Sequence, residues 1–271
     1  MRQPWMLGFA ILLCAATLFA GTAMADAADS ATVTVGSAIN KAGRQRMLSQ
    51  RMAKAWIMIG LGIQPKRGQM ILDESQSRFE KQLAELRDFV PNESVRKAQA
   101  RLDREWHSYR AALRATPGRQ NALAVYDHSE LTQEAAHRLT LAYEKLSGTP
   151  ANRLVNIAGR QRMLSQRMAK FWLFQAWDVN TAAARMELNF ARAEFASGMH
   201  QLYNAPRAST ETSAAIEQLD RDWMTYRAVL VERRDAAAMR GAAPEVVELS
   251  ERILASIEQL VTLCEQQADA H

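Results

Sequence analysis

The chain has 271 residues, of which 48% are hydrophobic, enough for one large domain or for two domains of ordinary size. Its formal net charge is +5, but the excess of basic residues lies in two short segments. Without Arg2 and the eight basic residues of segments 42–54 and 158–170, 25 basic and 29 acidic residues remain. A nucleic-acid binder would spread positive charge along a groove or stripe, so composition excludes that class and we expect no nucleic-acid partner.

The first 25 residues have the pattern of a cleavable signal peptide. Arg2 is followed by an apolar run over 6–19 and by the small-residue site Ala23-Met24-Ala25. An uncleaved anchor is the alternative, but the run is short for a membrane span. We therefore expect a periplasmic protein that begins near Asp26. Cys264 is then its one cysteine, which leaves packing rather than disulfides to hold the fold.

An internal repeat predicts the domain organisation. Segments 42–54 and 158–170 both read AGRQRMLSQRMAK, thirteen identical residues at an offset of 116. We call these the two motif segments. Further along, LDREW at 102–106 corresponds to LDRDW at 219–223. After the signal peptide at 1–25, we therefore predict two diverged copies of one domain, at 26–148 and 149–271.

Each copy reads as helix throughout. Apolar residues recur at three- and four-residue spacing, and no segment alternates like a strand. The breaks in this pattern coincide with prolines, at positions 65, 91, 117, 150, 206 and 244. Thr149-Pro150 has the form of a helix cap followed by proline in the first turn. The predicted fold class is all-α, with two tandem up-down four-helix bundles. Trp106 and Trp223 are expected in the core; a role in ligand binding is the alternative.

The motif segments carry basic and apolar residues on nearly every side of a helix. In the first segment Met47 lies among Arg44, Arg51 and Lys54 on the helical projection. Such a helix is packed all round, so part of its charge is buried and needs a counter-charge that the segment itself does not contain.

Two sources of that counter-charge are open. Asp and Glu of neighbouring helices are one, and a bound oxyanion, which suits the planar fork of arginine, is the other. Gln45, Ser49 and Gln50 add neutral donors, and Gly43 would admit a ligand or a second backbone close to the helix.

The sequence INKAGRQRMLSQRMAK at 39–54 resembles the signature of the PilJ-type sensor domain, the N-terminal module of type IV pilus methyl-accepting chemotaxis transducers. It is also similar to the P-box of nitrate/nitrite sensor histidine kinases. The residues at the fixed positions of that pattern are Asn40, Lys41, Ala42, Gly43, Arg46, Met47, Ser49 and Arg51. The second copy fits with Asn156, Ala158, Gly159, Arg162, Met163, Ser165 and Arg167, but has Ile157 in place of the lysine.

The resemblance implies a four-helix bundle that dimerises through its P-box helices, with nitrate or nitrite held between them by the last arginine of each motif. Here those arginines are Arg51 and Arg167, with Arg46 and Arg162 as supporting residues. The remaining expected ligand-site residues are Lys41, Gly43, Gly159, Ser49 and Ser165. Because Ile157 replaces the lysine, the second half of the site is expected to be weaker.

Two copies in one chain predict a pseudo-dimer. Helix 33–62 would pack beside helix 151–178, with Arg51 and Arg167 facing one shared pocket. The competing arrangement places the bundles end to end, joined by a continuous helix through residue 150.

The expected function is periplasmic binding or sensing of a small oxyanion, nitrate or nitrite. The chain ends without the membrane helix and output region of the family's receptors, so we expect it to act through a membrane sensor kinase, chemoreceptor or transporter. A ligand-free module that docks to such a receptor is the alternative. We expect no enzyme, cofactor or metal site, because common catalytic motifs are absent and the five histidines show no ligand spacing.

Overall fold

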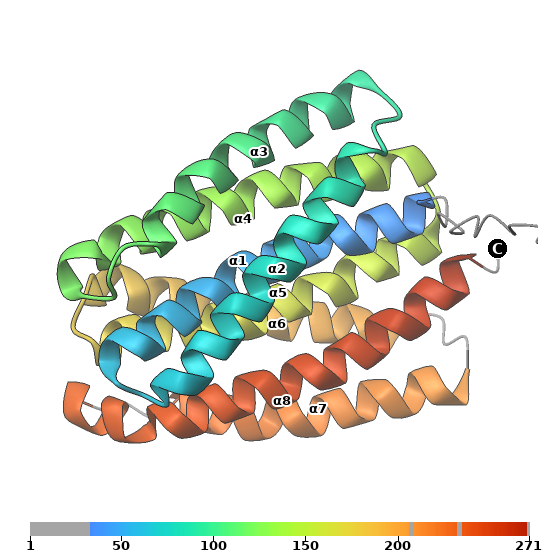
Figure 1. The fold of residues 1–271 in the computed structure, drawn as a ribbon. Coiled ribbons are helices and arrows are strands. Elements are labelled where there is room, and N and C mark those ends of the chain that lie inside the picture. The colour runs from blue at the N-terminus through green and yellow to red at the C-terminus, as the bar shows by residue number, and fades with distance from the viewer. Residues whose placement is uncertain (1–32, 206–208, 232–234, 270–271) are drawn as a thin grey trace, which may run out of the picture. The chain divides into compact units, whose positions relative to one another are not determined.

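The computed structural model describes residues 33–205, 209–231 and 235–269. The predicted signal peptide at 1–25 lies outside these residues. The described ranges contain eight helices and no strand (Figure 1). The helices are α1 (Val35–Leu61), α2 (Pro65–Arg87), α3 (Glu93–Leu113), α4 (Arg119–Ser147), α5 (Pro150–Ala176), α6 (Thr181–Asn204), α7 (Thr210–Val231) and α8 (Ala236–Asp269).

Local signals set the ends of the two motif helices, α1 and α5. The hydroxyl of Thr34 accepts from the backbone N–H of Ser37 at 3.1 Å, and Thr149 caps α5 in the same way. Gly148 ends α4 at a φ of 61°, in the left-handed region that favours glycine. The predicted cap at Thr149 and the proline in the first turn of α5 are confirmed. The reversal at Gly148 excludes the continuous helix through residue 150.

One proline does not behave as predicted. Pro65 and Pro150 begin helices, and Pro91 and Pro117 lie in connections, but Pro244 lies inside α8. The prediction of a helix break at this position is wrong. The neighbouring side chains Ala243, Val246 and Val247 are fully buried in the core, and their packing outweighs the roughly 3 kcal/mol that an interior proline costs. Pro206 lies outside the described residues.

The predicted all-α fold with two four-helix bundles is confirmed. In the first copy α2 and α4 pack on α1, and α3 packs on α4; in the second copy α6 and α8 pack on α5, and α7 packs on α8. Short connections reverse the chain after each of the first four helices, so α1 and α5 run in the same direction, as Figure 1 shows. These two helices pack side by side along the centre of the unit. The predicted pseudo-dimer, with helix 33–62 beside helix 151–178, is therefore confirmed.

The position of α1 and α5 explains their composition. Each lies against its own bundle on one side and the other copy on the opposite side. Even their polar side chains are buried. The polar residues of the motif segments with an exposed fraction of at most 1% are Gln45, Arg46, Ser49, Gln50, Lys54, Gln161, Arg162, Ser165, Gln166 and Lys170. The prediction of helices packed all round is correct.

Equivalent aromatic residues anchor the two bundles. The ring of Trp106 stacks on Phe79 at 4.2 Å between centroids, and Trp223 lies 4.4 Å from Phe195. Both tryptophans are buried, as predicted for core residues. Cys264 is buried too, and burial raises the pKa of its thiol to about 11, which suits a small packing residue rather than a reactive thiol.

Residues 33–271 form one compact unit in which the two copies share a core. The domain boundaries at 26–148 and 149–271 therefore stay a prediction. Within the described ranges, no helix is both long enough and apolar enough to cross a bilayer.

We predict opposite effects for two glycine substitutions in helices. In Gly60→Ala the new β-carbon would lie 2.3 Å from the indole of Trp177, a buried ring with little room to move. Stability should fall by about 1–3 kcal/mol. Gly241→Ala meets nothing within 4 Å in α8, and should gain about 0.5–1 kcal/mol from helix propensity. Urea unfolding followed by circular dichroism measures both. A gain for both variants would show that the Gly60–Trp177 approach does not constrain the packing of α1 on α5.

Candidate functional site

Two buried arginines meet where α1 and α5 touch. A β-carbon at Gly43 would lie 3.1 Å from Nη2 of Arg46 and 3.9 Å from Nη2 of Arg162. A β-carbon at Gly159 would lie 3.6 Å and 3.2 Å from the same atoms. Both guanidinium groups therefore lie against both glycines, where the absence of a side chain leaves room for this close approach. We call Arg46 and Arg162 the axial arginines.

The axial arginines make reciprocal contacts across the copies. Nη2 of Arg46 donates to the carbonyl oxygen of Asn156 at 3.4 Å, and Nη2 of Arg162 donates to that of Asn40 at 3.4 Å. Arg162 also donates to Oδ1 of Asn40 at 2.7 Å. Such reciprocity is the property of a two-fold interface between identical chains, here formed within one chain.

The counter-charges of the axial arginines differ. Arg162 donates to Glu258 of α8 at 2.8 Å, and Glu258 also accepts from Arg44 at 2.9 Å. Burial raises the pKa of Glu258, but Arg162 and Arg44 outweigh it and lower the pKa to about 2. Arg46 makes no ion pair with a carboxylate of the described residues. Its Nη1 lies 3.2 Å from Nδ1 of His137 in α4.

The surroundings of Arg46 are therefore electrostatically unfavourable. Burial, together with Arg160 and Arg162, lowers the pKa of Arg46 to about 9, although Glu144 opposes this. Burial and the charge of Arg46 lower the pKa of His137 to about 4, so the imidazole is neutral at pH 7. Its Nδ1 is assigned as the acceptor because the guanidinium can only donate.

A second layer of charge lies one to two turns further along the motif helices. Lys54 donates to Glu251 at 2.6 Å and to the Ser250 hydroxyl at 2.9 Å. In the other copy Lys170 donates to Glu130 at 2.6 Å and to Ser129 at 3.0 Å. Each lysine of one copy is thus neutralised by the last helix of the other copy. We call Glu130 and Glu251 the anchor glutamates.

The buried lysines remain charged at neutral pH. Burial raises the pKa of Glu251, but Lys54 and Arg51 outweigh it and lower the pKa to about 2. Burial lowers the pKa of Lys54 to about 8 against the opposing effect of Glu251. Lys170 behaves in the same way, with a pKa of about 8. Both pairs are therefore salt bridges at pH 7 rather than neutral hydrogen-bonded pairs.

The expectation that Arg51 and Arg167 face one shared pocket is wrong. Arg51 lies between α2 and α8, where it pairs with Glu251 at 2.5 Å and donates to Ser75 at 3.0 Å. Arg167 lies between α4 and α6, where it pairs with Glu130 at 2.5 Å and Glu187 at 2.8 Å. Arg51 and Arg167 therefore each pair with the anchor glutamate of the other copy and contact the second helix of their own copy, whereas Arg46 and Arg162 lie against Gly43 and Gly159.

The other predicted site residues have structural partners. The hydroxyls of Ser49 and Ser165 donate at 2.8 Å to the carbonyl oxygens of Arg46 and Arg162, one turn earlier in the same helix. Lys41 forms an ion pair with Glu85 of α2 at 3.0 Å. The structure therefore brings Gly43, Gly159 and the axial arginines together, and does not bring Lys41 to them.

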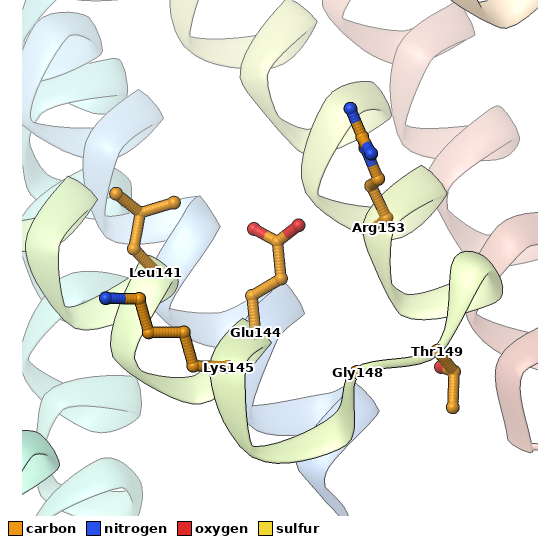
Figure 2. A pocket seen from close by; sticks show the side chains of 6 residues that line it. All are labelled: Leu141, Glu144, Lys145, Gly148, Thr149 and Arg153. Atoms are coloured by element: carbon orange, nitrogen blue, oxygen red, sulfur yellow. The ribbon is translucent and has the colours of Figure 1, made fainter.

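A groove runs over α5 between α4 and α6, with a volume of about 530 Å³. Its lining includes His137, Asn156 and Arg160, which are the neighbours of Arg46, and also Glu144, Arg153 and Glu194. The groove continues into a hollow of about 460 Å³ at the α4–α5 turn. Figure 2 shows Glu144 on α4 and Arg153 on α5 at the two sides of this hollow.

The carboxylates that neutralise the motif segments were not identified from sequence. The dipeptide Ser129-Glu130 recurs as Ser250-Glu251 at an offset of 121, five residues more than the offset of the motif segments. A comparison of the two last helices at this longer offset would have found the anchor glutamates.

Among known proteins, the family model described as type IV pili methyl-accepting chemotaxis transducer N-terminal matches residues 33–131 and 147–251. The two matched ranges contain one motif segment each. No curated protein and no solved structure matches the chain.

Removal of an anchor glutamate should destabilise the fold far more than removal of a surface glutamate. Glu251→Ala leaves the fully buried Lys54 without a counter-charge, and should cost about 2–4 kcal/mol. Glu248→Ala, on the same helix, removes an exposed pair with Arg67 and should cost less than about 1 kcal/mol. Urea midpoints of the two variants test this. Equal losses of stability in the two variants would mean that the Lys54–Glu251 pair contributes no more than a surface salt bridge.

Stability should fall as the pH drops from about 6.5 to about 4. His137 has a lowered pKa in the folded state, so between these values the unfolded chain binds a proton that the folded protein excludes. The stability that neutral His137 contributes is fully present above pH 6.5 and is lost as the pH falls toward 4. We expect about 1–2 kcal/mol, less than the full shift because the ring is only partly buried.

His137→Gln is the matched variant for this pH dependence. It should flatten the slope of unfolding free energy between pH 6.5 and about 5.5, above the range in which Glu251 and Glu258 of the unfolded chain take up protons. Urea unfolding at half-unit pH intervals measures this. An unchanged slope in the variant would assign the acid sensitivity to other groups.

Proposed function

We propose that this chain, which belongs to the family of type IV pili methyl-accepting chemotaxis transducer N-terminal domains, binds a small oxyanion such as nitrate or nitrite at the axial arginines. Membership of this family makes it a sensory or signalling module. In our proposal it works in the periplasm and passes the signal to a membrane chemoreceptor, sensor kinase or transporter.

The charge of Arg46 carries the proposal. A fully buried guanidinium without an ion-pair partner among the described residues is costly, and a protein keeps such a group where a ligand supplies the charge. The buried Nε of Arg162 also donates to no described group. The axial pair therefore retains both an unneutralised charge and an unused donor, which a planar oxyanion could satisfy.

The position of the axial pair suits a sensor. Because both arginines lie between α1 and α5, an anion bound there would interact with both copies at once. It would relieve the repulsion between two close guanidinium groups, and so favour one arrangement of the two bundles over another. This differential interaction is what a signal to a receptor requires.

A ligand-free docking module is the second candidate, and the ion pairs favour it. Carboxylates already neutralise seven of the eight motif cations, all except Arg46. The seven are Arg44, Arg51, Lys54, Arg160, Arg162, Arg167 and Lys170. In that case the motif would serve to join the two copies, and a receptor would recognise the outer surface.

Thermal unfolding with a panel of anions tests the proposal. Nitrate or nitrite at about a hundredfold excess over Kd should stabilise the protein by roughly 3 kcal/mol and raise Tm by several degrees. Arg46→Gln should abolish this shift, whereas Arg167→Gln, which changes an equally basic residue of the motif, should retain it. A shift lost only in the Arg167 variant would place the site at the last arginine of the motif. No shift with any oxyanion, confirmed by calorimetric titration, would favour the docking module.

A further inference from the structure

The last helices of the two copies present equivalent residues to the motif segments at a constant offset of 121. The pairs are Ser129 with Ser250, Glu130 with Glu251, His137 with Glu258, and Glu144 with Glu265. Ser129 and Glu130 accept from Lys170, and Ser250 and Glu251 accept from Lys54. The glutamates of the last pair accept from the amides of Asn156 and Asn40.

Only the third pair differs in charge. In the second copy Glu258 lies against Arg162, and in the first copy His137 lies against Arg46 at the equivalent position. The arginines two residues before the axial pair, Arg44 and Arg160, also differ in their partners. Arg44 shares Glu258, whereas its equivalent Arg160 turns away to Glu194 of α6 at 3.0 Å. Arg162 is therefore paired with a carboxylate, whereas Arg46 forms no ion pair among the described residues.

Each half of the site borders a groove. One of about 530 Å³ lies beside Arg46, whereas the groove of about 580 Å³ in the other half is lined by the carboxylates Glu251 and Glu258. His137, Asn156 and Arg160 line the groove between α4 and α6, and the first two of these contact Arg46 directly. Arg153 adds a further positive charge to the lining; of the two carboxylates there, Glu194 is paired with Arg160 and Glu144 accepts from the amide of Asn156. At the equivalent place in the other copy, Lys41 is held by Glu85 and Arg44 by Glu258. The imidazole of His137 would thus lie between a small anion in the groove and the guanidinium of Arg46, which has no ion pair.

We propose that the two halves of the site are not equivalent, and that a single oxyanion reaches Arg46 through the α4–α6 groove. His137 is the residue that permits this, because a neutral ring occupies the place that Glu258 fills with a negative charge in the other half. Glu258 acts there as a built-in substitute for the ligand. This inference rests on the proposed function, and specifies which half of the site is used.

Two substitutions of His137 separate charge from shape. His137→Glu recreates the Glu258–Arg162 pair at Arg46, so the carboxylate should compete with the ligand and weaken nitrate binding by about a hundredfold or more. The same variant should be at least as stable as the wild type without ligand, because Arg46 gains a partner. His137→Gln keeps a neutral hydrogen-bonding group of similar reach, and should weaken binding far less than His137→Glu does.

The second copy provides the matched control. Glu258→Gln removes the negative charge from the other half, and nitrate binding should be retained. Calorimetric titration and Tm of the full protein are measured for all variants. If His137→Glu does not fold, His137→Asp places the same charge on a shorter side chain.

The outcomes distinguish this inference from the proposed function. Wild-type binding that survives His137→Glu, or that is lost to the same extent in His137→Gln, overturns the non-equivalent site and leaves oxyanion binding in place. Tighter binding in Glu258→Gln with His137→Glu unaffected would assign the ligand to the opposite half. Failure of the wild type to bind any oxyanion overturns both.

Discussion

The structure depends on the neutralisation of cations that the motif helices carry into the core. Four side chains, Arg46, Lys54, Arg162 and Lys170, are fully buried, and the motif segments contain no acid. Burial of an isolated charge costs several kcal/mol, and carboxylates of other helices pair with three of the four, all except Arg46. For the lysines these are Glu251 and Glu130, each from the last helix of the other copy. The requirement for counter-charge therefore joins the two bundles in addition to the contact of α1 with α5.

This arrangement also explains why the repeat is most similar at its first helix. In an ordinary bundle each helix has a solvated face that tolerates change, but α1 and α5 have almost none over the motif segments. Gly43 and Gly159 admit guanidinium groups against the backbone, and Tyr109 and Tyr226 donate to the carbonyl oxygens of Ser49 and Ser165. A substitution at such a position affects both copies at once.

The fold was predictable because helical periodicity and an exact repeat are strong local signals, and the pairing of α1 with α5 followed from the resemblance. The orientation of the motif arginines could not be predicted from the sequence. A helical projection gives the direction of Arg51 relative to Arg46, but not which neighbouring helix lies there. The anchor glutamates were missed because their offset of 121 differs from the 116 of the motif segments. Pro244 was misread because proline propensity is local, whereas the packing of Val246 and Val247 is tertiary.

The connection of the two copies through Gly148 has a genetic consequence. A homodimer built from one bundle must carry the same residue on both sides of its axis, so His137 and Glu258 could not coexist in it. Once duplication has placed both halves in one chain, each half mutates independently, and one can lose its ligand requirement while the other keeps it. The fused chain can thus evolve properties that symmetry denies to a dimer of identical subunits, such as response to one ligand molecule without competition from a second.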